Sequence, residues 1–175
     1  MRIGILTVSD RCFRKERADD SGGFARSFFA GEEKIVRYTV VPDETEQIKK
    51  ALLEMSDRLK LDLVLTLGGT GLGPRDVTPE ATASVVDRLV PGIPEYLRSR
   101  IFYQNPHAAI SRALAGLRGK TLIVNLPGSP KAVLEQLALL SPLLSHIQEM
   151  IEGKDHPAAA PPAAGSPAAP TRWWS

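Results

Sequence analysis

Apolar and β-branched residues gather in four short runs, at residues 2–8, 34–41, 63–67 and 120–126, which predict the strands of a sheet. The third run contains Leu and Val around a single Thr, a pattern typical of a strand buried on both faces of a parallel sheet. Apolar residues at helical spacing predict helices at residues 24–30, 46–59, 78–89, 95–103, 108–114 and 130–151, the last with a break near Pro142. This alternation of strands and helices indicates an α/β fold.

The segment after the third run, GGTGLGP at residues 68–74, predicts a loop in which a ligand can approach backbone N–H groups closely. Thr78 and Pro79 then mark a helix start, with Thr78 as the N-cap and Pro79 at the first helical position. A strand, a glycine loop and a helix N-terminus in this order favour a phosphate ligand. The alternative is a tight turn whose glycines serve only the backbone geometry.

The pair Arg75-Asp76 distinguishes this loop from two familiar phosphate loops. No Lys-Ser/Thr pair follows the glycines as in a P-loop, and the G-x-G-x-x-G dinucleotide pattern is absent. A carboxylate repels a bare phosphate but binds hydrated Mg²⁺, which bridges to a phosphate. Asp76 therefore predicts a magnesium-assisted phosphate site.

Polar residues also follow the first two predicted strands. Ser9, Asp10 and Arg11 come directly after the first strand, and Asp43 follows the second. Ligands of open α/β sheets collect outside the carboxyl ends of the strands. If the strands are neighbours, Asp43 and Asp76 face one crevice. The alternative is that Ser9-Asp10 and Asp43 merely cap helices.

A second candidate anion site follows the fourth strand, in the segment from Asn125 to Lys131. Pro127 and Gly128 indicate a loop, and Ser129 with Pro130 opens the next helix near the charge of Lys131. His107 lies in a turn, where a solvated histidine is a simpler interpretation than a proton carrier.

Composition narrows the class of protein. The 175 residues suit one domain, residues 1–152. The Ala/Pro-rich segment 153–175 predicts a disordered tail that ends in Trp173-Trp174. This Trp pair could be a docking peptide, but the interpretation that it has no function is favoured. A net charge of +2 is too small to predict a nucleic-acid surface. A lone cysteine, Cys12, excludes an internal disulfide, and the absence of a long apolar segment predicts a cytoplasmic protein that binds no membrane.

Several segments taken together resemble the MogA/MoaB family of molybdopterin adenylyltransferases and the G domain of gephyrin. The matching segments are Thr7 to Arg11, Pro42 to Glu44, Gly68 to Gly71, Arg75 to Thr82, Ser111-Arg112 and Asn125 to Pro130. The resemblance covers roughly residues 1 to 151, and this ordered set is far more specific than any one motif. The chain has no extra subdomain near its C-terminal helix, so its subgroup stays open.

The resemblance implies a three-layer α/β/α sandwich, a homotrimer, and AMP transfer from Mg-ATP to the terminal phosphate of molybdopterin before the molybdenum-insertion enzyme of the pathway acts. It implies that Asp43 and Asp76 are catalytic and organise Mg²⁺. It assigns the nucleotide to Ser9, Asp10, Gly68, Gly69, Thr70, Gly71 and Arg75. It assigns molybdopterin to Ser111, Arg112, Asn125, Pro127, Gly128, Ser129 and Lys131.

Two alternatives to the adenylyltransferase remain. One is a carrier or scaffold of the same fold that binds molybdopterin without catalysis; a pure binder has no need for paired metal-binding carboxylates. The other is an α/β nucleotide-binding domain with a different substrate, which the Ser111-Arg112 and Asn125 to Pro130 segments disfavour. Binding of ATP without any dependence on molybdopterin would point to it.

Overall fold

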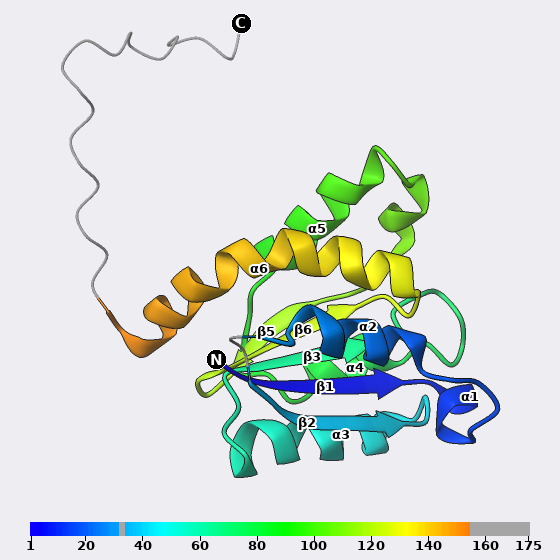
Figure 1. Cartoon of the computed structure of the whole chain (residues 1–175), viewed down its shortest axis with the longest axis horizontal. Helices are drawn as coiled ribbons and strands as arrows, with labels where there is room; N and C mark the ends of the chain where they lie inside the picture. The colour runs from blue at the N-terminus through cyan, green and yellow to red at the C-terminus, as the bar shows by residue number, and fades with distance from the viewer. Residues whose placement is uncertain (32–33, 155–175) are drawn as a thin grey trace, which may run out of the picture.

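The computed structural model describes residues 1–31 and 34–154, and its centre is a six-stranded sheet with strand order β2-β1-β3-β6-β5-β4 (Figure 1). Strands β2, β1, β3 and β6 are parallel to their neighbours, whereas β5 pairs antiparallel with β6 and β4 pairs antiparallel with β5. The strand bounds are β1 (Arg2–Val8), β2 (Lys34–Val41), β3 (Leu63–Leu67), β4 (Arg88–Leu89), β5 (Ala115–Arg118) and β6 (Thr121–Leu126). The mostly parallel sheet confirms the predicted fold class.

Helices cover both faces of this sheet. Their bounds are α1 (Asp10–Phe13), α2 (Asp20–Phe28), α3 (Thr45–Leu53), a π-helical turn η1 (Glu54–Arg58), α4 (Thr78–Ala83), α5 (Gly92–Phe102), a 3₁₀-helix η2 (Pro106–Ile110) and α6 (Pro130–Glu152). One core contains residues of α2, α5 and α6, and the other contains residues of α3, η1 and α4. The structure is therefore the predicted three-layer sandwich.

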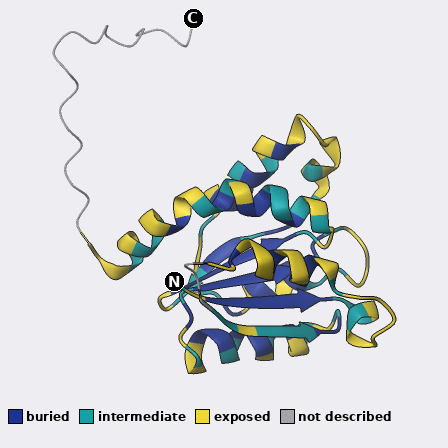
Figure 2. Cartoon of the chain, in the orientation of Figure 1, coloured by how far each residue is buried: buried dark blue, intermediate teal, exposed yellow. Residues whose placement is uncertain are grey.

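The alternation of side chains along β1 explains the two cores. Ile3 and Ile5 pack in the core beneath α2 and α6, whereas Leu6 and Val8 pack in the core above α3. Figure 2 shows the central strands dark blue along their length, and every residue of β3 is buried. Each aliphatic side chain buried in this way stabilises the fold by roughly 1.5–3 kcal/mol, so the central strands fix the sheet on which the loops are mounted.

Tertiary contacts overrule two of the predicted helices. The helix predicted for residues 78–89 ends at Ala83, because Arg88 and Leu89 pair with β5, a strand that the sequence did not predict. The helix predicted for residues 108–114 is also wrong. Its first residues belong to η2, and the backbone N–H of Arg112 donates to the carbonyl of Thr70 instead of to its own turn.

Helix α6 runs without the break predicted at Pro142. Leu140 and Leu144, on either side of that proline, are both buried in the core, so packing holds the helix together there. At its C-terminus Gly153 adopts φ +75°, the left-handed conformation typical of a helix end. The predicted tail lies outside the described residues from position 155 onward. Among the helices of the described residues, none combines the length and apolarity needed to cross a bilayer.

Candidate active site at the carboxyl ends of the strands

The carboxyl ends of four parallel strands meet at one edge of the sheet. Val8 of β1 is in register with Val41 of β2, and Leu67 of β3 is in register with Thr7 of β1 and with Leu126 of β6. The loops that follow these strands therefore lie side by side. This arrangement brings the Ser9, Asp43, Gly68 and Pro127 segments together, as their positions after predicted strands suggested.

Asp43 and Asp10 are joined by a reciprocal pair of hydrogen bonds across 33 positions of sequence. The backbone N–H of Asp10 donates to Oδ2 of Asp43 at 2.7 Å, and the N–H of Asp43 donates to Oδ1 of Asp10 at 3.1 Å. The N-cap of α3 is Glu44, and no side chain makes a capping hydrogen bond there. The alternative in which Asp43 merely caps a helix is therefore wrong, whereas Ser9 does cap α1, accepting from the N–H of Cys12 at 3.3 Å.

Arg75 clamps the carboxylate of Asp10. Its Nε and Nη2 atoms donate to Asp10 at 3.1 and 2.9 Å. This guanidinium holds the pKa of the Asp10 carboxyl below its ordinary value. The pKa of the Asp43 carboxyl is raised instead, first by burial and then by the charges of Asp10 and Asp76. Asp43 is thus a half-buried carboxylate that forms no ion pair within the described part of the chain, and the charge of Arg75 only partly offsets its burial.

The backbone of the glycine loop takes conformations that favour glycine. Gly68 and Gly69 have φ of +105° and +63°. A Cβ at Gly68 would lie 2.5 Å from the carbonyl oxygen of Val8, and a Cβ at Gly69 would lie 2.3 Å from Oγ1 of Thr78. These two glycines let the loop pass directly over the neighbouring strand end.

Both predicted catalytic carboxylates flank this loop. A Cβ at Gly69 would lie 3.3 Å from Oδ1 of Asp43, and a Cβ at Gly71 would lie 3.0 Å from Oδ2 of Asp76. The same Asp76 oxygen accepts a hydrogen bond from the N–H of Gly73 at 2.8 Å, which fixes its direction. The structure therefore brings Asp43 and Asp76 to one loop from the ends of two different strands.

The helix after the loop starts one residue earlier than predicted. Val77 is the N-cap of α4, and Thr78 is the first helical residue with Pro79 behind it. Thr78 is completely buried, and its hydroxyl oxygen has no hydrogen-bond partner among the residues that the structure describes. The predicted capping role of Thr78 is wrong because its side chain is held beneath the glycine loop.

Arg112 holds the glycine loop from the side. Its Nε donates to the carbonyl of Gly71 at 2.7 Å, and its other nitrogens contact the carbonyl of Asp76 and the carboxylate of Glu80. Asn125 is 1% exposed and donates to the hydroxyls of Thr66 and Thr82, both at 2.9 Å. Both side chains thus support the loop and the sheet from behind, and their predicted contact with molybdopterin stays a prediction.

The loop after β6 is short and leads directly into α6. Ser129 caps this helix and accepts from the N–H of Ala132 at 3.2 Å, while Ser21 donates to the carbonyl of Gly128 at 2.8 Å. Lys131 is different from its neighbours, because its side chain is 88% exposed and lies 3.8 Å from the carboxylate of Glu135. Lys131 does not line either cavity of this site.

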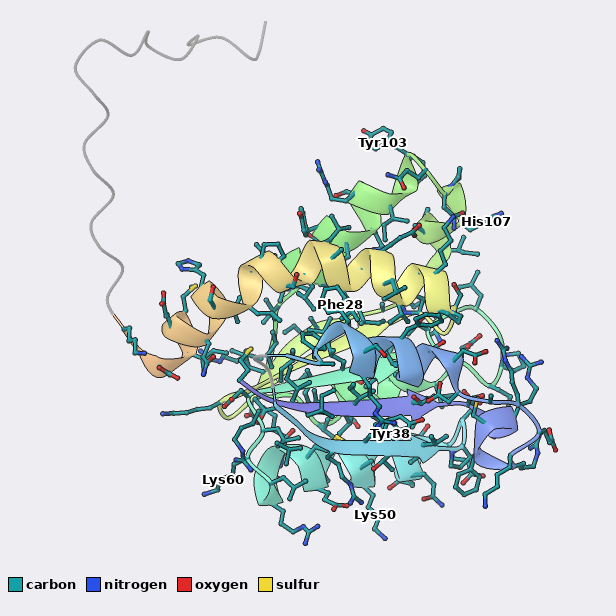
Figure 3. The ribbon with its side chains drawn as sticks, in the orientation of Figure 1. Phe28, Tyr38, Lys50, Lys60, Tyr103 and His107 are labelled. Atoms are coloured by element: carbon teal, nitrogen blue, oxygen red, sulfur yellow. The ribbon has the colours of Figure 1, made fainter. Side chains whose placement is uncertain are left out.

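Two cavities open beside these loops and share Ser129. The larger, about 360 Å³, lies beside the end of β1 and contains Ser9, Arg11, Arg17 and Gly128 in its wall. The smaller, about 250 Å³, lies between the glycine loop, η2 and α6, and is lined by Thr70, Gly71, Ile101, Asn105, His107, Ala108, Ile110, Ser111, Pro127, Ser129, Ala132 and Gln136. Figure 3 shows His107 projecting from the segment near the start of α6, whereas Tyr103 lies farther out.

Gln136 lies beside the site although its sequence position did not predict it there. This residue looked like part of an ordinary core helix, yet it lines the smaller cavity. One signal was present, because Gln136 is a polar residue on the same face as Val133, Leu137 and Leu140, which are fully buried. A polar residue on the apolar face of a helix indicates either a buried partner or a ligand.

The mostly parallel sheet, with carboxylates and a glycine loop at the carboxyl ends of its strands, places this protein in the α/β class with its candidate site at that edge. A family model described as a probable molybdopterin binding domain matches residues 4–146, and the chain belongs to this family.

Three relatives illustrate this membership. The molybdopterin adenylyltransferase of Helicobacter pylori (strain J99) is 38% identical over 156 residues, covering 87% of this chain and 89% of that protein. The molybdenum cofactor synthesis protein cinnamon of Drosophila melanogaster is 42% identical over 153 residues; the match covers 85% of this chain but only 25% of cinnamon. The crystal structure of the molybdopterin biosynthesis enzyme MoaB from Thermus thermophilus superposes with a TM-score of 0.82 at 51% identity, covering 87% of this chain and 97% of that one.

Proposed function

We propose that this protein is a molybdopterin adenylyltransferase, which transfers AMP from ATP to the terminal phosphate of molybdopterin. An oxygen of that phosphate forms a bond to the α-phosphorus of ATP, the bond from this phosphorus to the β-phosphate oxygen breaks, and pyrophosphate leaves. Such a reaction asks a protein mainly to align two polyanions and to neutralise their charge. The full-length similarity to the Helicobacter pylori enzyme supports this activity.

The observation that carries the proposal is the pair of carboxylates beside one glycine loop. Asp43 and Asp76 approach the loop from the ends of β2 and β3, and Asp43 is held half-buried with a raised pKa. A cation between them would relieve the cost of that burial. Among the described residues no group of three or more His, Cys, Asp or Glu side chains is placed to hold a metal ion. Two carboxylates nevertheless fit Mg²⁺, which completes its shell with waters and substrate phosphates.

In this proposal the chain's own residues divide the work. Asp43 and Asp76 would hold Mg²⁺, which supplies charge neutralisation on the triphosphate. Arg75 lies on the exposed side of Asp10, where its guanidinium can also face a phosphate. The N–H of Gly68 donates to the carbonyl of Leu126, so the glycine loop offers backbone N–H groups from Gly69 to Gly71, and Arg112 keeps that loop in place.

The two cavities suit the two substrates. We assign the larger cavity, with Ser9 in its wall, to the nucleotide, and the smaller cavity, with Ser111 and Pro127, to molybdopterin. Ser129 lies in the wall of both cavities. In this arrangement Ser129 stands near the point where the phosphate of molybdopterin meets the α-phosphate of ATP.

Pyrophosphate release from Mg-ATP tests the proposal. The wild-type protein should release pyrophosphate only with molybdopterin present, and Asp76→Asn and Asp43→Asn should lower turnover by roughly 10²–10³-fold, the usual effect of removing one electrostatic contact to a transition state. Asp57→Asn is the matched control, since Asp57 pairs with Arg118 at the opposite end of the sheet. Full activity in either site variant would remove that carboxylate from the mechanism. Binding of molybdopterin without any pyrophosphate would identify a carrier.

Three further parts of the prediction belong to this proposal. The family resemblance predicts a homotrimer, and exposed apolar side chains at the end of α5, Phe102 and Tyr103, offer a surface for assembly. Light scattering on the purified protein would measure its mass. The resemblance also predicts that the adenylylated product passes to a molybdenum-insertion enzyme, and the sequence predicts that this occurs in the cytoplasm.

A further inference from the structure

Gln136 is a largely buried residue whose amide has no hydrogen-bond partner among the described residues. The residue is 8% exposed, and its side chain makes no hydrogen bond to any residue within the described part of the chain. The amide atoms themselves are not sealed from solvent, because the buried side-chain atoms without a partner among the described residues are all hydroxyls, and Gln136 lines an open cavity. Its neighbours on the helix, Val133 and Leu137, belong to the apolar core. The structure of the free protein alone therefore gives no reason for an amide at this position.

The amide faces the smaller cavity rather than the core. Gln136 lines this space of about 250 Å³ together with Ile101, Ile110 and Pro127, which form apolar walls. Ligand cavities for drug-sized molecules usually measure roughly 300–1,000 Å³, so this one suits a single ring system rather than a whole nucleotide. Apolar walls beside one largely buried amide, with Asn105 and His107 also in the lining, match a fused nitrogen heterocycle.

Hydroxyl groups at the rim complete the cavity. Ser111 accepts a hydrogen bond from the N–H of Ala113 at 3.3 Å, and Ser129 accepts from the N–H of Ala132 at 3.2 Å. Each hydroxyl uses its oxygen as the acceptor in these contacts, so its O–H remains available as a donor. These donors line the same cavity as Thr70 and Gly71 of the glycine loop, where we place the phosphate end of the substrate.

We propose that Gln136 is a specificity-determining residue, whose amide pairs with the donor and acceptor edge of the pterin ring of molybdopterin. A primary amide presents one acceptor and one donor side by side, and it reads the matching edge of a heterocycle through two hydrogen bonds. A pterin offers such an edge in its ring N–H and its adjacent carbonyl. The proposal rests on the assignment of this cavity to molybdopterin, and it adds the group that recognises the ring.

Adenine also has a donor and an acceptor side by side on one edge of its ring. The position of the cavity is therefore our reason for assigning it to the pterin and not to adenine. The cavity lies beside Ser111 and Pro127, on the β6 and α6 side of the glycine loop. The other cavity, beside Ser9 and the end of β1, leaves room for the nucleotide. Recognition of adenine by Gln136 is therefore the competing outcome in the test.

The test compares Gln136→Leu, which keeps the size of the side chain but removes both hydrogen bonds, with the wild-type protein. The KM for molybdopterin should rise roughly ten- to hundred-fold, the effect expected for one good bidentate pair, while the KM for Mg-ATP and kcat stay within about two-fold. Gln136→Asn, which keeps the amide, should recover part of the affinity. Gln148→Leu is the matched control on the same helix, because Gln148 bonds only to Glu152 far from the cavity.

A second measurement separates this inference from the proposed function. The Kd of molybdopterin, measured by titration without ATP, should rise in Gln136→Leu by the same factor even if the wild-type protein released no pyrophosphate. An unchanged Kd and KM for molybdopterin in a folded Gln136→Leu protein would overturn the inference. A rise in the KM for Mg-ATP alone would assign Gln136 to adenine and would overturn it as well.

Discussion

The loops after β3 and β6 begin side by side at the same edge of the sheet, yet they are held in different ways. The loop after β3, residues 68–77, leads into a helix of only six residues and is fixed by side chains from elsewhere, above all Arg112. The loop after β6, residues 127–129, leads into a helix of 23 residues and is capped by its own Ser129. The first loop depends on several contacts from the completed fold, whereas the second combines its local cap with one distant hydrogen bond, from Ser21 to the carbonyl of Gly128. The following predictions test that difference.

The largest effect is expected from Gly69→Ala in the first loop. The new Cβ would combine a left-handed backbone with an overlap against Oγ1 of Thr78 at 2.3 Å, so the free energy of unfolding should fall by about 2–4 kcal/mol. Gly119→Ala is the control, because Gly119 also has a positive φ of +55° but nothing lies within 4 Å of its added Cβ. It should lose about 1–2 kcal/mol from backbone strain alone. Urea unfolding measures both, and equal losses would contradict the overlap.

Arg112→Met should loosen the first loop and leave the second unchanged. Removal of the contacts to the carbonyls of Gly71 and Asp76 should lower stability by about 2 kcal/mol and raise the KM for Mg-ATP. Arg118→Met is a matched control, since Arg118 also makes three hydrogen bonds, to Asp57 and to the carbonyl of Val85, far from the site. It should lose similar stability with no change in KM. If the two variants had the same KM, the holding role of Arg112 would be wrong.

Ser129→Ala removes the cap of the second loop and should have a moderate effect. Loss of a capping hydroxyl usually lowers stability by about 1 kcal/mol, and the long helix α6 is otherwise held by its buried face. Ser129→Thr keeps the hydroxyl and the cap and should restore the thermal midpoint. A thermal melt of the three proteins makes the comparison, and a loss as large as that of Gly69→Ala would show that the second loop depends on distant contacts as much as the first does.

The smallest effect on stability is expected from removing the negative charge of Asp43, which lies beside the first loop. The folded-state pKa of Asp43 is raised above 3.8, so the ionised carboxylate opposes folding at neutral pH. Asp43→Asn, which keeps an acceptor for the N–H of Asp10, should therefore raise Tm at neutral pH by about 1–3 °C after allowance for its exposure. The gain should disappear as the pH falls through the raised pKa, because the wild-type carboxyl then becomes neutral too.

Asp57→Asn should change Tm at neutral pH in the opposite direction from Asp43→Asn. The pKa of Asp57 is lowered by its hydrogen bonds to Arg118, so its ionised form favours folding. Its replacement should lower Tm at neutral pH, and this loss should fade as the pH falls toward the lowered pKa. Melting curves of both variants from neutral to acid pH measure these changes in Tm. A lower Tm of Asp43→Asn than of the wild type at neutral pH would contradict the conclusion that ionised Asp43 opposes folding.

The sequence predicted the strands whose own pattern of apolar residues distinguishes them. The bounds of β1, β2 and β3 are confirmed, because continuous or alternating apolar residues distinguish a buried strand. The sequence did not predict β5, whose four residues Ala115–Arg118 include a glycine and an arginine and are defined as a strand by pairing with β6. Short strands of this kind depend on their neighbours rather than on their own composition.

The candidate site also combines features that local sequence predicts with features that depend on distant contacts. Asp43 and Asp76 were predicted as site residues because each follows a recognisable strand, and the structure brings both to the glycine loop. The clamp of Arg75 on Asp10 joins residues 65 positions apart, and no local pattern indicates such a pair. Gln136 was missed for a related reason, since its helix looked like core and only the cavity shows that its amide faces outward from that core.

The attachment of Arg112 to the glycine loop also bears on the order of folding. Arg112 and Gly71 are 41 positions apart, and Arg112 reaches the loop from the segment that leads into β5. The loop can take its final shape only after that segment has docked beside β6, so the binding site should form late, after the parallel strands have assembled. For the same reason, brief local opening at the β5 edge should release the loop while the rest of the sheet stays folded, which native-state hydrogen exchange would detect as early exchange at both segments.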